Sequence, residues 1–223
     1  VYSMDWKPLY RNVDAMRYLY DPERPGQVAV SESRLSLPPG EYIIGTQFSD
    51  SGGDAFGAQY DTVTVEPYAP GEFNISDIEL ASRVFEDFRV AIKGGLRVIA
   101  NPTQTYLKSN PVLIFYEVYG LTKDEFGQAR YQVTYSVSPS AHEGKFVSSI
   151  LRSIGKVLKS EQKETVTIST EQTGYRTEQS EYIELDVTKS QEGKYDLVVT
   201  VTDPVGGASA TKKTSFWLRE PVE

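Results

Sequence analysis

The stretch that decides the fold of this chain is GKYDLVVTVTD, residues 193–203. Every second residue from the tyrosine onward is apolar, which is typical of a strand that buries one face. These residues are Tyr195, Leu197, Val199 and Val201. Asp203 and the dipeptide Gly206-Gly207 come next, and an aspartate with nearby glycines is typical of a hairpin turn. The stretch therefore predicts a strand, a tight turn and a returning strand.

The same pattern occurs earlier in the chain, in GEYIIGTQFSD, residues 40–50. In both copies a tyrosine opens the strand two positions after a glycine. We predict that Tyr42 and Tyr195 bury their rings and bond their hydroxyls to nearby backbone, as the tyrosine corner of β-sandwiches does. Asp50 and Asp203 are predicted to accept hydrogen bonds from backbone N–H groups in their turns. The repeat indicates two related β-sandwiches.

The length of the chain agrees with two domains, since one β-sandwich takes roughly 100 residues and the chain has 223. We expect an all-β protein made of two tandem sandwiches of the immunoglobulin or fibronectin III kind. The boundary is placed at Gly94-Gly95, which gives domains 1–94 and 95–223. The first domain has fewer strand-like segments, so we expect it to be smaller, or incomplete at its N-terminus.

The second domain contains about seven strand-like segments, the number that an immunoglobulin-like sandwich needs. Residues 112–120 are apolar on both faces, as in a central strand that is covered on both sides. Residues 131–137 alternate between apolar and polar, as in a strand with one buried face. Residues 124–127 lie between these segments and predict a hairpin loop.

Residues 145–159 break the strand pattern, because their apolar residues recur at spacings of three and four, as on one face of a helix. Gly155 within the segment lowers helix stability by about 1 kcal/mol. We predict a short amphipathic helical insertion here, with basic residues that include Arg152 and Lys156. It can cover an edge of the second sandwich, contact a partner, or lie on an anionic membrane surface, and we favour the first.

Composition disfavours several classes of protein. The chain has no cysteine, which rules out disulfides, zinc–thiolate sites and cysteine nucleophiles. Its formal net charge of −8 argues against nucleic acid as a partner, since phosphates are repelled. The longest apolar stretch, residues 111–116, is far too short for a transmembrane segment.

One part of the chain carries a family resemblance. The run LIFYEVYGL at residues 113–121, followed by Gly127 and by YQVTY at residues 131–135, resembles the β-sandwich portion of bacterial GWxTD-domain proteins. Residues 76–81 and 193–203 share the resemblance. The GWxTD motif itself does not occur in this chain. The resemblance therefore implies a sandwich fold and an envelope-associated or secreted bacterial protein, and it brings no catalytic residues.

Candidate catalytic groups are few. His142 is the only histidine, so a Ser-His-Asp triad would have to use it, and no nucleophile-elbow pattern accompanies it. Glu117 interrupts an apolar strand and is expected to be partly buried, but no second carboxylate at a glycosidase separation is identifiable. We therefore predict no catalytic residue, no bound cofactor and no enzymatic activity.

Calcium is the metal with candidate ligands. Asp50, Asp54 and Asp61 crowd the first predicted hairpin, and calcium takes six to eight oxygen ligands. Their spacing departs from that of an EF-hand, and the second copy of the repeat offers only Asp203. A plain hairpin without metal is the favoured interpretation.

These observations favour a non-catalytic structural or protein-interaction module that works outside the cytoplasm, with a protein partner or self-association. The candidate interaction surface contains Trp217, Tyr106, Phe126, Arg152 and Lys156. The alternative is an accessory carbohydrate-binding module that uses exposed aromatic residues to bind glycans. A row of coplanar exposed aromatic rings would favour the glycan hypothesis, and a long uncovered edge strand would favour protein partners.

Overall fold

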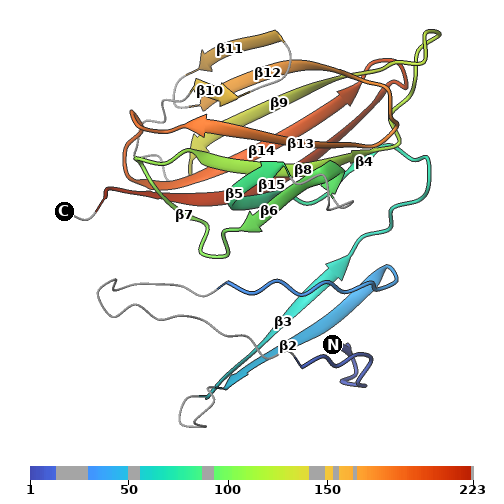
Figure 1. The fold of residues 1–223 in the computed structure, drawn as a ribbon, viewed down its shortest axis with the longest axis vertical. Helices are drawn as coiled ribbons and strands as arrows, with labels where there is room; N and C mark the ends of the chain where they lie inside the picture. The colour runs from blue at the N-terminus through green and yellow to red at the C-terminus, as the bar shows by residue number, and fades with distance from the viewer. Residues whose placement is uncertain are drawn as a thin grey trace. The chain divides into compact units, whose positions relative to one another are not determined.

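The computed structural model describes residues 1–13, 30–49, 56–86, 93–140, 149–152, 156–162 and 165–221. The chain divides into two compact units, Val1–Ala69 and Pro70–Glu223. The all-β prediction is confirmed, because every regular element of the described residues is a strand except one short 3₁₀ turn, Lys93–Gly95. Figure 1 shows the strands of each unit.

The division at Ala69 does not coincide with the predicted boundary at Gly94-Gly95. Strand β5 (Glu79–Glu86) pairs with β8 (Val112–Tyr119) of the second unit, with Leu80 opposite Ile114. Leu80 is buried in the core of that unit. The second unit therefore begins at Pro70, and the apolar side chains of Ile75, Leu80 and Ala81 are buried in it.

The first unit is a single antiparallel sheet in the part of it that the structure describes. Its strands are β1 (Tyr2–Ser3), β2 (Gly40–Ser49) and β3 (Phe56–Val65), in the order β1-β2-β3. β2 and β3 form the predicted hairpin, with Tyr42 opposite Val63. The prediction of a complete sandwich here is not confirmed, because no second sheet faces this one among the described residues.

The described residues of the second unit form two sheets of six strands each. The first sheet has the order β10-β13-β8-β5-β6, and β4 also pairs with β8. Besides β5 and β8, its strands are β4 (Asn74–Ile75), β6 (Leu96–Ala100), β10 (Ser149–Arg152) and β13 (Gln179–Asp186). The second sheet has the order β11-β12-β9-β14-β15-β7. Its strands are β7 (Thr105–Leu107), β9 (Ala129–Pro139), β11 (Lys156–Gln162), β12 (Thr165–Gly174), β14 (Gly193–Asp203) and β15 (Ala208–Arg219).

Side chains from both sheets form one hydrophobic core in the second unit. β8 contributes Ile114 from the first sheet, while β9 and β14 contribute Val133 and Leu197 from the second. Leu113 and Phe115 on the opposite face of β8 belong to a smaller apolar cluster with residues of β5 and β6. The prediction of a central strand buried on both faces is thus confirmed for β8, as is the alternation of β9.

Both predicted tyrosine corners are present. The hydroxyl of Tyr42 donates a hydrogen bond to the carbonyl of Pro38, over 2.7 Å, and that of Tyr195 donates to the carbonyl of Gln191, over 2.9 Å. In each copy the acceptor lies four residues before the tyrosine. The intervening glycine has a positive φ, 155° in the first copy and 148° in the second, which suits glycine. The repeat therefore reproduces the same local geometry twice.

Asp203 has the predicted role in the second hairpin. Its Oδ1 accepts hydrogen bonds from the N–H groups of Val205 and Gly206, over 3.0 and 2.9 Å, and its Oδ2 accepts one from the N–H of Thr122, over 2.8 Å. Burial acts to raise the pKa of the carboxyl, but these backbone bonds outweigh it and hold the pKa below the ordinary value. Asp203 thus fixes its own turn and also the loop that contains Thr122. Asp50, its counterpart in the repeat, lies outside the described residues.

The helix predicted over residues 145–159 is wrong at the residues described there. β10 pairs with β13 at the edge of the first sheet, and β11 pairs with β12 at the edge of the second, both antiparallel. Without them, the backbone N–H and C=O groups along the edges of β13 and β12 would lack these partners. Pairing along two edges outweighs a helical preference that Gly155 already weakens.

Replacement of Tyr195 tests the importance of the tyrosine corner for stability. Tyr195 is buried against Phe216, with the rings stacked at 5.8 Å between centroids. We expect Tyr195→Ala to lower the free energy of unfolding of the second unit by about 3 kcal/mol or more. Tyr195→Phe, which removes only the hydroxyl, is expected to lower it by about 1 kcal/mol. Chemical denaturation of the three proteins measures this order, and an unchanged midpoint for Tyr195→Ala would contradict the assignment.

Candidate functional site

Trp217 is accessible at the surface of the second unit, as the prediction of an interaction residue requires. It belongs to β15 and points away from the core, with 39% of its surface exposed. The guanidinium carbon of Arg219 lies 5.1 Å from the centroid of its ring, within the range of a cation–π interaction. On the neighbouring strand β14, Lys194 stands directly opposite Trp217 in the ladder. The sequence predicts Trp217 as an interaction residue, but these two basic neighbours were not predicted.

Tyr106 is not a surface residue, which corrects its place among the interaction candidates. It is buried in the core, with its ring edge-on to Phe216 at 6.2 Å between centroids. Its hydroxyl donates a hydrogen bond to the carbonyl of Ala81, over 2.9 Å, and lies 3.3 Å from the carbonyl oxygen of Leu113. Because β7 is only three residues long, its sequence carries too little periodicity to show which face is buried.

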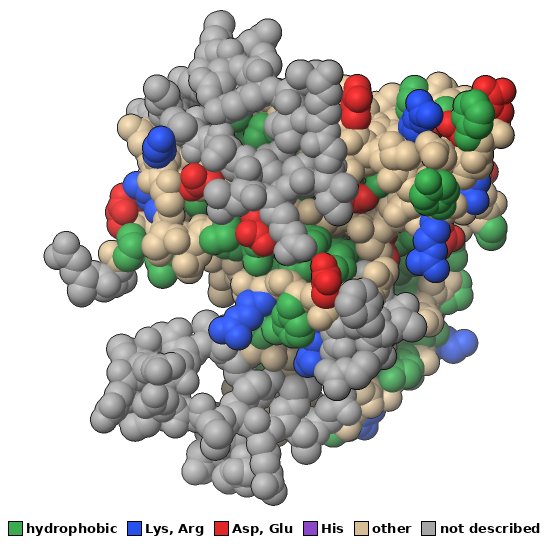
Figure 2. All heavy atoms as spheres, turned by 45° about the horizontal axis from the view of Figure 1, so that its top comes forward, with side chains coloured by type: hydrophobic (Ala, Val, Ile, Leu, Met, Phe, Trp, Pro, Cys, Tyr) green, Lys and Arg blue, Asp and Glu red, His purple; other side chains and the backbone are tan. Residues whose placement is uncertain are grey.

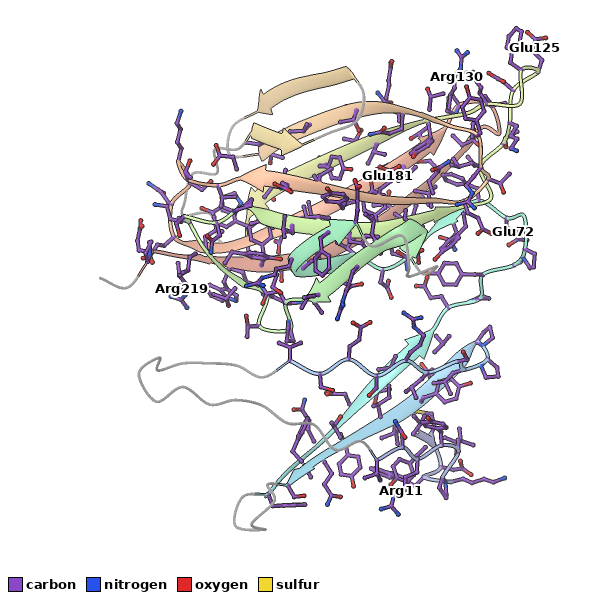
Figure 3. All side chains as sticks on the ribbon, in the orientation of Figure 1. Arg11, Glu72, Glu125, Arg130, Glu181 and Arg219 are labelled. Carbon is purple, nitrogen blue, oxygen red and sulfur yellow. The ribbon has the colours of Figure 1, made fainter. Side chains whose placement is uncertain are left out.

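Phe126 occupies the tip of the hairpin loop between β8 and β9 and is 73% exposed. Asp124 builds this loop by accepting hydrogen bonds from the N–H groups of Phe126 and Gln128, both over 2.9 Å. Arg130 forms an ion pair with Asp124, over 3.3 Å. Figure 3 shows Arg130 and Glu125 at this end of the second unit. The structure thus leaves Phe126 accessible.

The two basic candidates from residues 145–159 lie on edge strands. Arg152 ends β10, where it pairs with Glu184, and Lys156 begins β11, where it pairs with Glu171. The structure describes their backbone and not their side chains. His142, the only imidazole of the chain, lies outside the described residues.

The three calcium candidates are not brought together by the described residues. Asp50 and Asp54 fall outside them. Asp61 is exposed on β3 and accepts a hydrogen bond from the amide of Gln59, over 2.7 Å. Within the described ranges, no group of three or more metal-ligating side chains lies close enough to hold an ion.

Glu117 faces away from the core of the sandwich. Its carboxylate accepts hydrogen bonds from the hydroxyls of Tyr119, over 2.9 Å, and Ser180, over 3.2 Å. Its backbone N–H donates to the hydroxyl of Ser76, over 2.9 Å. Glu117 therefore cross-links β8 to β13 and to the segment before β5, which is a structural role.

Glu181 is a half-buried carboxylate on the inner face of its strand. It projects from β13 between the two sheets, and Figure 3 labels it within the body of the second unit. The hydroxyl of Tyr131, from the facing sheet, donates a hydrogen bond to Glu181 Oε1. Close by, the hydroxyls of Tyr116 and Tyr135 share a hydrogen bond of 2.6 Å across the sheets. These four residues, which we call the Tyr–Glu cluster, form a polar layer within an apolar core.

Burial changes the proton equilibria of the Tyr–Glu cluster. It raises the pKa of the Glu181 carboxyl above its ordinary value, and the hydrogen bond from Tyr131 offsets this only in part. Burial also raises the pKa of Tyr116, Tyr131 and Tyr135, so these phenols stay protonated at neutral pH. A paired-carboxylate reaction needs a second carboxyl group, and the described hydrogen-bond partner of Glu181 is a tyrosine.

A signal for Glu181 was present in the sequence. Ile183, Leu185 and Val187 form an apolar series of period two, and its extension backwards by one step reaches Glu181. A strand period therefore places this carboxylate on the buried face. Glu117 drew attention instead because it interrupts an apolar run, although its position in the period places it on the opposite face from Tyr116.

Three aromatic rings of the first unit meet on one face of its sheet. Ring centroids lie 5.8 Å apart for Tyr2 and Trp6, 6.4 Å for Tyr2 and Tyr60, and 5.4 Å for Trp6 and Tyr60. Trp6 and Tyr60 are each 56% exposed. The planes meet at 51°, 56° and 71°, so the group is not a coplanar row. Gly45 makes the cluster possible, because a Cβ there would lie 2.6 Å from a ring carbon of Tyr60.

Comparison with known proteins finds only weak structural likenesses. No family model matches the sequence, and no curated protein matches it. A cohesin module from the family 33 glycoside hydrolase of Clostridium perfringens ATCC13124 is 14% identical, with a TM-score of 0.33, over 53% of this chain and 92% of the module. AvmM, which catalyses macrocyclization in alchivemycin A biosynthesis, is 9% identical, with a TM-score of 0.31, over 56% of this chain and 88% of its own. At these values the likenesses carry no functional argument.

Two further observations bear on partners. Among the helical residues that the structure describes, none form a segment with the length and hydropathy needed to cross a bilayer. On the face shown in Figure 2, basic side chains lie scattered among acidic and polar ones rather than in a continuous stripe. A stripe of that kind is the usual footprint of nucleic-acid binding.

Replacement of Glu181 is expected to change how stability depends on pH. Because its pKa is raised in the folded state, the folded chain binds more protons than the unfolded chain between the ordinary and the raised pKa. Stability from this group is therefore fully present below the ordinary value and is lost as the pH rises through the raised one. Glu181→Gln removes this loss, so we expect the variant to gain stability over the native chain at pH 7.5 relative to pH 4, by about 1.4 kcal/mol for each unit of pKa shift.

Calorimetric unfolding of both proteins at several pH values measures this difference. Glu184→Gln provides a matched control, since Glu184 lies on the same strand and Glu181 and Glu184 are on opposite faces of β13. Equal pH profiles for the two variants would show that the carboxyl of Glu181 is not linked to folding.

Proposed function

We propose that this chain is a non-catalytic protein-interaction module of a secreted or envelope-associated bacterial protein. The observation that carries the proposal is the exposure of the β2–β3 hairpin in the first unit. Phe48 is 63% exposed and Phe56 is 66% exposed, at the far end of the hairpin from Tyr42. Leaving such side chains in water forgoes roughly 1.5–3 kcal/mol of burial each, which is typical of surfaces that contact other proteins.

The repeat supplies a comparison within the same chain. In the second unit, the residues that follow Tyr195 at period two are Leu197, Val199 and Val201, and all are fully buried under the facing sheet. In the first unit the corresponding positions after Tyr42 hold Ile44, Thr46 and Phe48, of which Ile44 is half-buried and the other two are exposed. The same hairpin thus has a covered face in one unit and an accessible face in the other.

The outer edge of β3 adds a second feature that suits a protein partner. β3 is ten residues long, and its described pairing is with β2 on one side. Within the described residues no strand pairs with its other side. Unpaired backbone donors and acceptors on an edge strand can bind a strand of another chain.

The aromatic group of Tyr2, Trp6 and Tyr60 is the observation that favours the alternative, a carbohydrate-binding module. Sugar rings stack on aromatic faces, and Trp6 and Tyr60 are exposed while Tyr2 is half-buried. Their planes are mutually tilted by 51° to 71°, which does not provide one flat platform. We therefore place the protein-interaction function first and keep glycan binding as the second candidate.

The experiment that tests the proposal is affinity capture from bacterial envelope and culture-supernatant fractions. The full chain serves as bait beside the double variant Phe48→Ser/Phe56→Ser, with Phe126→Ser as a matched control on the second unit. We expect the native chain and the control to capture the same proteins and the double variant to lose about tenfold or more of them, since each aromatic contact contributes 1 kcal/mol or more.

Equal capture by all three baits, or by none, would overturn the hairpin as an interaction surface. A glycan panel run in parallel separates the second candidate. Binding of a sugar that Trp6→Ala abolishes would make this chain a carbohydrate-binding module instead.

A further inference from the structure

The outer face of the second sheet carries basic side chains around an exposed indole. Trp217 and Arg219 lie two positions apart on β15, and Lys194 of β14 stands opposite Trp217. Lys213 is exposed on the same face of β15, four positions before Trp217. We call these four residues the Trp217 surface. Three of them are cations, in a chain whose formal net charge is −8.

An apolar residue of the adjoining strand extends the Trp217 surface. β7 pairs in parallel with β15, so that Leu107 lies beside Arg219 and Thr105 beside Trp217. Leu107 is 39% exposed, as Trp217 is. The indole of Trp217 and the side chain of Leu107 are therefore two accessible apolar groups on neighbouring strands, and the guanidinium of Arg219 lies over the indole ring.

The cations of the Trp217 surface are not neutralised by ion pairs in the part of the chain that the structure describes. By contrast, Lys108 and Lys212 of the second unit each form an ion pair: Lys108 lies 2.5 Å from Glu220, and Lys212 lies 3.0 Å from Asp77. One carboxylate, that of Asp196, lies on the same face of β14, and it accepts a hydrogen bond from the hydroxyl of Ser140 over 2.7 Å. The face between β14 and β15 thus presents three cations and one anion.

We propose that the Trp217 surface binds an acidic peptide segment in which carboxylates alternate with an apolar side chain. This proposal rests on the protein-interaction function and names one partner chemistry for it. Carboxylates complement Arg219, Lys194 and Lys213, since a guanidinium can hold a carboxylate through two parallel hydrogen bonds. The apolar side chain of the peptide packs on Trp217 and Leu107, and a partly exposed tryptophan next to an arginine is a common centre of protein contacts.

Nucleic acid fits this surface less well, although it is also anionic. Its binding needs many phosphate contacts, and the remaining charge of this acidic chain repels a long polyanion. A short acidic peptide needs only the local cations. It also offers the apolar side chain that the indole and the leucine can cover.

Titration calorimetry of the full chain with a synthetic peptide of repeated Glu-Glu-Leu units tests the proposal. A peptide of the same length with Lys in place of Glu is the charge-reversed probe. We expect the acidic peptide to bind and the basic one not to. The affinity for the acidic peptide should fall between about 0.01 M and 1 M ionic strength, because salt screens exposed charges.

The variant Lys194→Gln/Arg219→Gln is expected to weaken binding of the acidic peptide about tenfold or more, since bonds to charged groups contribute over 1.4 kcal/mol. Trp217→Phe should weaken it as well, by removing the larger ring. Lys189→Gln is the matched control, because Lys189 is an exposed cation in the turn before β14, and it should leave the affinity unchanged. Thermal melting of each variant confirms that it folds.

Equal affinity of the native chain and the Lys194→Gln/Arg219→Gln variant would overturn the proposal, as would equal binding of the basic peptide or no binding at all. The proposed function has a separate readout, capture by the β2–β3 hairpin. Capture that persists without binding of the acidic peptide would leave the protein-interaction function standing and would reject only the Trp217 surface. Loss of hairpin capture with retained peptide binding would reject the β2–β3 hairpin as an interaction surface and would leave the Trp217 surface standing.

Discussion

The two sheets of the second unit are joined at one side by the side chain of Tyr106. Its ring packs edge-on against Phe216, which in turn stacks on Tyr195, so three aromatic residues of one sheet form a continuous group. Its hydroxyl reaches the other sheet and donates to the carbonyl of Ala81, close to the point where the pairing of β5 with β8 ends. A carbonyl buried there without a donor would cost about 1–3 kcal/mol. One residue thus supplies both apolar contact and hydrogen bonding between the sheets.

The residues that the sequence placed best are those whose neighbours lie close along the chain. The tyrosine corners join Tyr42 and Tyr195 to carbonyls four residues earlier in the chain. Asp203 accepts hydrogen bonds from the backbone N–H groups two and three residues later. Their geometry is set by local spacing and by glycine, so the repeat of residues was enough to predict it. The partner of Asp203 at Thr122 could not be predicted in the same way, because nothing in the local pattern specifies a contact across 81 positions.

The predictions that are wrong concern residues whose neighbours lie far away along the chain. Residues 149–152 and 156–162 are strands because β13 and β12 offer edges to pair with, and those edges are assembled from distant parts of the chain. The surface position predicted for Tyr106 is wrong for the same reason. Its burial depends on Phe216 and on the carbonyl of Ala81 in β5, both distant in the sequence. Glu181 is an intermediate case. The strand period places it inside, but only the structure shows that Tyr131 faces it from the other sheet and makes its burial tolerable.

The two proposed interaction surfaces differ because the two units expose different apolar and charged residues. The second unit buries the apolar face of its repeat hairpin, so its accessible chemistry is on the outer face, where Trp217 is surrounded by cations that lack described ion pairs. The first unit leaves much of its hairpin exposed, including the large side chains of Phe48 and Phe56 among polar neighbours. Exposed phenylalanines and a basic aromatic face attract different chemical groups. If both proposed surfaces bind, this chain can hold more than one segment of its partners, and neither proposal requires a reacting group.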